Sequence, residues 1–145
     1  MRTVLSAVSN GKLTSLALAV IVMGLLVAGC SGPSEQAELI GEYEAKFDYG
    51  IETLALMAEG KYDQHLAVSA TGETVSHSGR WTFDQRTDTV ILNDPLLFDD
   101  NFGKLNPEFR APVSGGRHLD VRVRPGSLAL VWNDDQGVEF RRTRR

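Results

Sequence analysis

Residues 74–84 read TVSHSGRWTFD, the stretch in which apolar and polar side chains alternate most regularly. Successive side chains of an extended strand point to opposite faces, so every second residue shares a face. One face is mostly apolar, and its members are Val75, His77, Gly79, Trp81 and Phe83. The other face is polar, and its members are Ser76, Ser78, Arg80 and Thr82. One buried and one solvated face is typical of a strand in an antiparallel sheet.

Shorter segments with similar alternation flank this strand, and turn signals separate them at intervals of roughly 8–12 residues. The segments lie at residues 43–47, 51–58, 61–69, 89–92, 119–123, 128–132 and 138–142. Turns at Glu59-Gly60, Thr71-Gly72 and Pro125-Gly126 join several of them as hairpins. The pattern predicts an all-β fold, an antiparallel up-and-down meander of about eight strands. Closing this meander into a small barrel would remove both exposed edges.

An export signal precedes the alternating region. Residues 16–30 read LALAVIVMGLLVAGC without a charge, after the basic residues Arg2 and Lys12. A basic start, an apolar core of about 7–15 residues and a small-residue end are the parts of a signal peptide. A helix that spans a membrane needs about 20 apolar residues, so a single-pass anchor is the less favoured alternative.

The end of this segment, Val27-Ala28-Gly29-Cys30, resembles the lipobox of bacterial lipoprotein precursors. The resemblance implies that residues 1–29 are removed and that the Cys30 thiol and the new amino terminus carry fatty acids such as palmitate. Two or three acyl chains would hold the protein to a bilayer. Ser31 stands where the family's inner-membrane retention signal is typically Asp, which implies an outer-membrane location facing the periplasm in a double-membraned bacterium. The alternative is that Cys30 is a small buried residue at the end of an apolar helix.

Length and charge limit the organisation of the chain. It has 145 residues and a formal charge of −4, with 15 basic and 19 acidic residues. We expect a lipoprotein signal peptide over 1–29, a lipidated cysteine and flexible tether over 30–38, and a single all-β domain over 39–145. The acidic balance argues against nucleic acid as a partner. The single cysteine excludes an intramolecular disulfide and a zinc site built from several cysteines.

Three segments of the domain resemble small bacterial lipoproteins with a lipocalin-like barrel. The segments are Gly41-Glu42-Tyr43, Glu59-Gly60-Lys61-Tyr62 and Ser78-Gly79-Arg80-Trp81-Thr82-Phe83. The resemblance covers residues 41–92 and implies a carrier of a small apolar ligand. The candidates for the barrel interior are large aromatic side chains, Trp81, Phe83 and Trp132, and these favour an interior filled by the protein itself.

Residues 93–116 form a long segment without alternation. It contains Pro95, Pro107 and Pro112 together with several apolar side chains. A loop of this length is uncommon in a compact domain unless it has a function. We expect it either to fold back and cap one end of the barrel or to act as a partner-binding or ligand-gating loop. The candidate binding residues are Leu97, Phe98, Phe102 and Phe109.

No catalytic motif is found, so we do not expect an enzyme, and no cofactor is implied. His65 and His77 would lie directly opposite each other only across a three-residue loop, and a two-residue loop would place them on opposite faces. We therefore expect no metal site there. The chain ends in Arg141-Arg142-Thr143-Arg144-Arg145, for which we expect a solvated basic tail. Contact with anionic lipid head groups or an acidic partner is the alternative.

These observations predict where the protein acts better than what it does. We expect a lipid-anchored protein of the cell envelope, attached to the membrane through its N-terminal lipid. We expect it to act as a binding or structural module that contacts a protein or another envelope component. A lipocalin-like carrier of a small apolar ligand is the alternative function.

Overall fold

The computed structural model describes residues 35–100, 104–133, 135 and 137–144. All described residues belong to one compact unit. The predicted signal peptide, Cys30 and the first part of the tether lie outside the described residues, as does Phe102. Among the described residues, no helix has the length and apolar character needed to cross a membrane.

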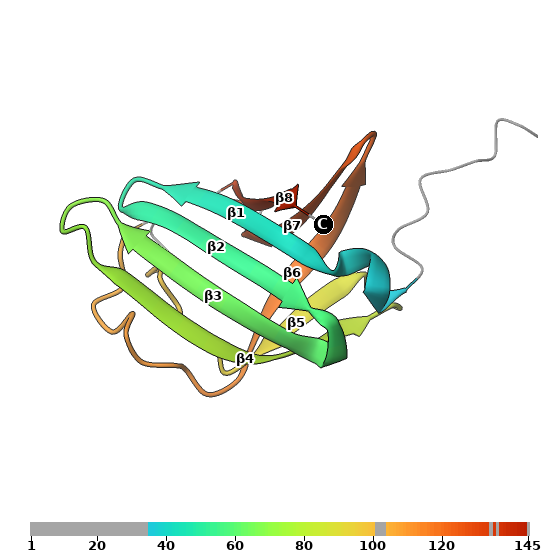
Figure 1. Ribbon diagram of the computed structural model, residues 1–145, viewed down its shortest axis with the longest axis horizontal. Coiled ribbons are helices and arrows are strands. Elements are labelled where there is room, and N and C mark those ends of the chain that lie inside the picture. Colours follow the sequence, from blue (N-terminus) through green and yellow to red (C-terminus); the bar gives the residue numbers. More distant parts are fainter. Residues whose placement is uncertain (1–34, 101–103, 134, 136, 145) are drawn as a thin grey trace, which may run out of the picture. The chain divides into compact units, whose positions relative to one another are not determined.

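Eight antiparallel strands form a closed barrel in which each strand pairs with its neighbours in chain order (Figure 1). This confirms the predicted all-β, up-and-down fold. The strands are β1 (Gly41–Phe47), β2 (Gly50–Met57), β3 (Lys61–Val68), β4 (Thr74–Asp84), β5 (Thr89–Asn93), β6 (Gly116–Arg124), β7 (Ser127–Asn133) and β8 (Val138–Arg144). There are two short 3₁₀ helices. The first, η2 (Gln36–Leu39), precedes β1, and the second, η3 (Ala58–Gly60), joins β2 to β3.

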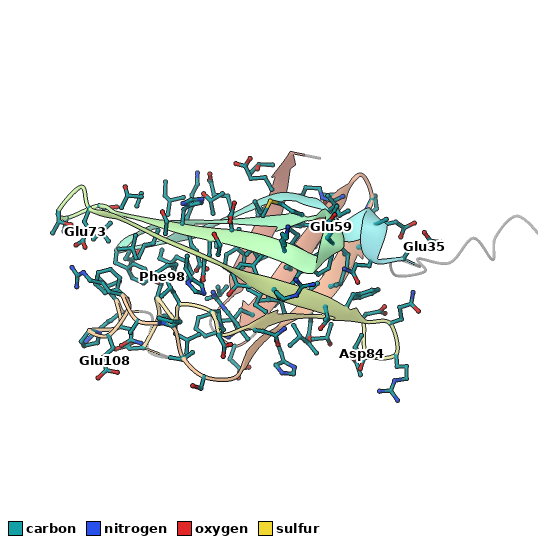
Figure 2. The ribbon with its side chains drawn as sticks, turned by 60° about the horizontal axis from the view of Figure 1, so that its bottom comes forward. Glu35, Glu59, Glu73, Asp84, Phe98 and Glu108 are labelled. Carbon is teal, nitrogen blue, oxygen red and sulfur yellow. The ribbon has the colours of Figure 1, made fainter. Side chains whose placement is uncertain are left out.

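The alternating direction of the strands gives the barrel two different ends. One end, which we call the η2 end, holds η2, η3, the turns at 85–88 and 125–126, and the last residues of β8. The opposite end, which we call the capped end, holds the turns at 48–49 and 69–73 and the long segment 94–115. Figure 2 shows Glu35, Glu59 and Asp84 at the η2 end, and Glu73 and Glu108 at the capped end.

Large side chains fill the barrel interior because alternate residues of every strand point inward. The main core cluster draws on all eight strands, and its largest fully buried members are Tyr43, Tyr62, Trp81 and Phe140. On β4 the predicted inward face is observed, with Trp81 buried and Thr82 exposed beside it. Gly79 provides room for Tyr62, which lies opposite it in the register.

Residues 141–144 form part of the barrel wall, which corrects the prediction of a solvated tail for this stretch, and Arg145 lies outside the described residues. Strand β8 extends to Arg144 and pairs with β1 through Tyr43↔Arg142 and Glu42↔Arg144. The Arg142 guanidinium donates hydrogen bonds to the carbonyls of Glu38 and Ile40 and to the Tyr43 hydroxyl. The strand continues through the charged run because pairing with β1 closes the sheet and leaves no edge.

Candidate functional site at the capped end

The described residues of the segment 94–115, which are 94–100 and 104–115, form a cap over one end of the barrel. Two isolated β-bridges, Leu96↔Pro112 and Asp99↔Leu105, hold its two limbs together. The Asn106 amide donates to the Phe98 carbonyl at 2.8 Å, and the Asn106 side chain donates to the Leu97 carbonyl at 3.1 Å. These bonds satisfy the backbone of a long loop without a regular strand or helix.

Apolar side chains of the cap close the end of the barrel. Leu96, Phe98 and Phe109 are buried and pack with Leu66 and Val68 of β3. The Phe98 and Phe109 rings lie 6.5 Å apart at an angle of 59°. Among the predicted binding residues, Phe98 and Phe109 therefore face the barrel, as Figure 2 shows for Phe98, and neither is available on the surface. Leu97 is half-buried.

A buried polar network lies beneath this cap. The Arg117 guanidinium on β6 donates to Glu52 on β2 at 2.7 Å, and both side chains are almost fully excluded from solvent. The Gln64 amide on β3 donates to the same Glu52 oxygen at 2.8 Å. Gln64 also bonds both backbone groups of Leu96, at 2.9 and 3.0 Å, so the network is joined to the cap.

The network separates two apolar regions of the interior. Along β3, Gln64 lies between Tyr62 of the main core and Leu66 of the cap cluster. The Arg117 guanidinium also stacks over the Trp132 ring, 4.0 Å from its centroid. A buried charge is tolerated only where it is paired and bonded, and the Glu52 carboxylate supplies that pairing.

Tyr49 reaches the same region from the turn between β1 and β2. Burial raises the pKa of the Tyr49 phenol well above its ordinary value, and the Glu52 and Asp99 carboxylates raise it further. Its hydroxyl is buried and has no hydrogen-bond partner among the described atoms, and the same is true of Arg117 Nε and His77 Nε2. The region under the cap therefore combines a buried ion pair with buried polar atoms, Tyr49 Oη and Arg117 Nε, that have no hydrogen-bond partner among the described atoms.

This network was not predicted, although the sequence contains a signal for it. Glu52, Gln64 and Arg117 occupy inward positions of their strands. The next inward residue on each strand is apolar: Leu54, Leu66 and Leu119. A polar residue on an otherwise apolar face is informative because it must find a partner inside. The sequence alone does not show that the three residues meet.

The outer face of the cap is charged and fixed in place. The Arg110 guanidinium binds the Glu73 carboxylate through two bonds of 2.8 and 2.6 Å and lies over the Phe109 ring, 4.2 Å from its centroid. The hydrogen bonds from Arg110 hold the pKa of the Glu73 carboxyl below its usual range. The exposed residues of this face are Lys104, Pro107, Glu108, Arg110, Ala111 and Pro112.

The predicted interior residues all contact the main core. Trp81 is buried, and its indole Nε1 donates to the Met57 carbonyl at 3.0 Å. Phe83 and Trp132 are half-buried and pack against the same cluster.

The two histidines on adjacent strands do not form a metal site. His65 pairs with Ser76 in the register and binds its hydroxyl at 2.8 Å on the outer face. His77 pairs with Gln64, whose side chain points inward, so the two imidazoles lie on opposite faces of the sheet. No group of three or more metal-binding side chains occurs within the described part of the chain.

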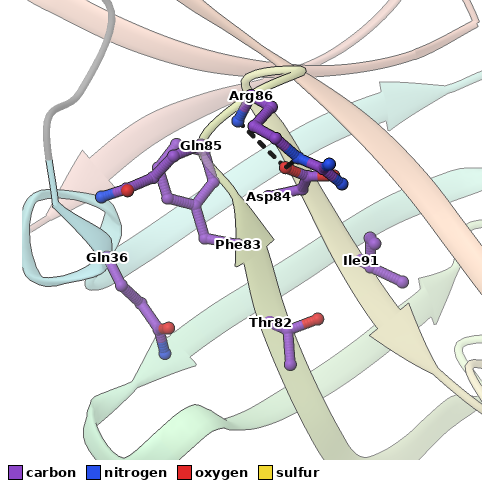
Figure 3. Close-up of a pocket in the computed structure, with 7 residues that line it drawn as sticks. All are labelled: Gln36, Thr82, Phe83, Asp84, Gln85, Arg86 and Ile91. Atoms are coloured by element: carbon purple, nitrogen blue, oxygen red, sulfur yellow. Dashed lines mark hydrogen bonds and ion pairs between the residues drawn. The ribbon is translucent and has the colours of Figure 1, made fainter.

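A cleft lies at the η2 end, next to the turn between β4 and β5 (Figure 3). Its volume is about 510 Å³, and its lining residues are Gln36, Thr82, Phe83, Asp84, Gln85, Arg86 and Ile91. The Arg86 guanidinium faces the Asp84 carboxylate at 3.5 Å, as the dashed lines in Figure 3 indicate. These two opposite charges pair with each other at the solvent-exposed wall of the cleft. The pair therefore gives the cleft no net charge that would attract a charged ligand.

Comparison of the chain with protein-family models, with curated proteins and with solved structures gives no match.

Proposed function

We propose that the protein is a lipid-anchored binding module of the bacterial cell envelope. The anchor would be the acylated Cys30, and the binding surface would be the outer face of the cap. The chain enters the barrel through η2, and the cap closes the opposite end. A lipid at the start of the chain would therefore leave the cap on the side of the barrel remote from the point of attachment.

The observation that carries this proposal is the fixed conformation of the cap. Its buried rings, its bond to Gln64 and the Arg110–Glu73 pair hold its outer surface against a closed barrel. Binding residues are often found on loops that a rigid scaffold positions. A preformed surface loses less conformational entropy when a partner binds.

The interior of the barrel supports surface binding more than transport of a ligand. Tyr43, Tyr62, Trp81 and Phe140 are fully buried within it, and the Arg117–Glu52 pair occupies the region beneath the cap. An apolar ligand would have to displace aromatic side chains or lie against a buried ion pair. Both changes cost free energy, because the ion pair and the packed core would lose their contacts.

Radiolabelled palmitate tests the anchor. The protein expressed in its own host should incorporate the label and sediment with membranes. Cys30→Ser should abolish labelling and release the protein, because only a thiol can form the thioether. Membrane retention of Cys30→Ser without label would contradict the lipid anchor and support a spanning helix.

Site-specific photo-crosslinking tests the binding surface. Deleting 94–115 would be uninformative, because the deletion also removes Leu96, Phe98 and Phe109 from the core. A photo-reactive residue at exposed Glu108 should instead give a discrete adduct in the host envelope, whereas one at exposed Ala67 on the barrel wall should not. Unlabelled protein should compete for the adduct, and its Arg110→Glu variant should not. Identical adducts at both positions, or none at Glu108, would contradict binding through the cap.

A further inference from the structure

The cleft at the η2 end lies where neighbouring strands of the barrel wall differ in length. Strand β3 pairs with β4 only as far as Lys61↔Arg80, whereas β4 continues to Asp84 and stays paired with β5 to that point. In the registers of the described strands, residues 82–84 therefore have a neighbouring strand on one side only. Figure 3 shows Gln36 of η2 on the side of β4 that β3 leaves uncovered. The registers of two strands thus leave an opening in the wall, and the cleft occupies it.

The size and the lining of the cleft are those of a site for a small molecule. Its volume of about 510 Å³ lies within the range of about 300–1,000 Å³ that is usual for such sites. Phe83 and Ile91 are half-buried and supply apolar surface, and the other lining residues are polar. Sites for small molecules typically combine apolar surface with a few polar groups that fix the orientation of the ligand.

Two of the polar side chains are available to a ligand. Gln36 and Thr82 are exposed, and the side chain of neither makes a hydrogen bond within the described part of the chain. An amide has separate donor and acceptor atoms, and a hydroxyl both donates and accepts. These two side chains are therefore suited to ligand groups that also do both, and hydroxyl groups are the simplest of these.

The charged pair of the lining has one fixed member and one free to turn. The Asp84 carboxylate accepts a hydrogen bond from the Arg86 backbone N–H at 2.9 Å. This bond and those from the Arg86 guanidinium hold the pKa of the Asp84 carboxyl below its usual range, so the group stays ionised. The guanidinium lies 3.5 Å from the carboxylate, and the Arg86 side chain is 89% exposed. An exposed pair of this kind is weak, so the guanidinium can turn toward a ligand at little cost.

The charges around the cleft favour a neutral ligand. Besides the Asp84–Arg86 pair, residues 35–39, 58–61, 80–84 and 85–88 carry four acidic and two basic side chains. They are Glu35, Glu38, Glu59, Asp88, Lys61 and Arg80. The acidic excess disfavours an anion. A cation would have to compete with Arg86 for Asp84, the only carboxylate of the lining.

We propose that this cleft binds a neutral sugar, either free or as one residue of a polysaccharide. A neutral sugar ring carries hydroxyl groups that both donate and accept hydrogen bonds, and its faces present apolar C–H surface. Its hydroxyls would bond the Gln36 amide, the Thr82 hydroxyl and the charged pair. Its C–H surface would pack on Phe83 and Ile91. This site is separate from the cap and does not depend on the lipid anchor.

Saturation-transfer NMR tests the site in the complete protein, purified from its own host in a detergent without a sugar head group. The probe is N-acetylglucosamine, which is neutral, and its charged counterparts are the cation glucosamine and the anion glucuronate. The neutral sugar should receive saturation and titrate with a Kd on the order of 1 mM, because an open cleft covers only part of a small ligand. The two charged sugars should bind at least about three-fold more weakly.

Substitutions in the lining locate the binding. Thr82→Val and Gln36→Ala each remove a hydrogen-bonding group and should weaken binding by about two- to ten-fold. The matched control is Thr74→Val, which changes an exposed threonine on the same face of β4 at the capped end and should leave the Kd unchanged. Circular dichroism checks that all three variants fold.

The β-1,4-linked tetramer of N-acetylglucosamine distinguishes the two sources of the sugar. A tetramer that binds more than about four-fold tighter than the monomer exceeds the statistical advantage of its four rings and indicates a polysaccharide. A smaller gain indicates a free sugar. Absence of saturation in the neutral sugar would overturn the proposal, as would tighter binding of either charged sugar. An unchanged Kd in both Thr82→Val and Gln36→Ala would place the sugar elsewhere and overturn the assignment of the cleft.

Discussion

At the scale of single residues, the absence of a side chain at Gly79 determines how Tyr62 packs. A methyl group added at Gly79 would lie 2.6 Å from three atoms of the Tyr62 side chain. Tyr62 is fully buried, and its hydroxyl donates to the Asn93 carbonyl at 3.0 Å. Because the ring cannot move without breaking that bond, Gly79→Ala should lower the free energy of unfolding by about 1–3 kcal/mol. Urea denaturation measures this change.

A double variant identifies the cause of that loss. Tyr62→Leu removes the ring atoms that the new methyl group would meet. Gly79→Ala should therefore cost much less in the Tyr62→Leu background than in the native protein. Equal costs in the two backgrounds would show that the clash with Tyr62 is not the reason.

The buried ion pair is a second residue-scale feature with a measurable consequence. Arg117→Met leaves the Glu52 carboxylate buried with only Gln64 as a bonded partner. Removing one partner of a buried pair typically costs about 3–5 kcal/mol. The control is Arg124→Met, which breaks the partly exposed pair with Glu139, whose arginine is half exposed, and should cost about 1 kcal/mol or less. If urea denaturation gives similar losses for the two variants, the Arg117–Glu52 pair does not stabilise the interior.

At the scale of elements, β8 closes the barrel through Arg142. Its guanidinium donates to backbone carbonyls at the end of η2 and to the Tyr43 hydroxyl, so one side chain joins η2, β1 and β8. Arg142→Gln should lower the free energy of unfolding by about 1–3 kcal/mol and speed hydrogen exchange of the β1 and β8 amides. Arg141→Gln, at an exposed position on the same strand, should change it by less than about 0.5 kcal/mol. Equal effects would mean that Arg142 is an ordinary surface arginine.

The elements that the sequence predicted well are those whose pattern is local. Alternation in 74–84 identified β4 and its inward face, because a strand's period is a property of neighbouring residues. The sequence allows two interpretations of the cap, because the contacts of Phe98 with β3 depend on residues distant in the chain. The same reason explains why the Glu52–Gln64–Arg117 network was missed. The charged end of β8 was predicted to be a tail because the strand that pairs with it, β1, lies at the other end of the domain in the sequence.

At the scale of the whole molecule, the two ends of the barrel differ in chemistry. The η2 end carries the turn between β6 and β7, with the exposed Val123 close to it, and the capped end presents a fixed polar face. A closed barrel makes these ends a fixed distance apart, because no strand can slide without breaking the registers on both sides. An anchor at one end would therefore set the position of the binding surface at the other.

Closure of the barrel also predicts how the whole protein responds to alkaline pH. All three tyrosines, Tyr43, Tyr49 and Tyr62, belong to the described barrel. Burial raises the pKa of each phenol, to about 12 for Tyr62. An unfolded tyrosine titrates near pH 10, so above that pH the unfolded chain binds fewer protons than the folded barrel. Stability should therefore be fully present below about pH 10 and decline as the pH rises toward the folded pKa values.

Absorbance of phenolate during a pH titration checks this expectation. The folded protein should show little phenolate near pH 10, whereas the same chain in concentrated urea should titrate normally there. Phenolate should then appear together with the loss of near-ultraviolet circular dichroism, because ionisation of the buried rings and opening of the barrel are linked. If the folded protein gave three ordinary titrations near pH 10 while its circular dichroism stayed native, the phenols would be open to solvent. The barrel interior would then be accessible, and the carrier function would become the better explanation.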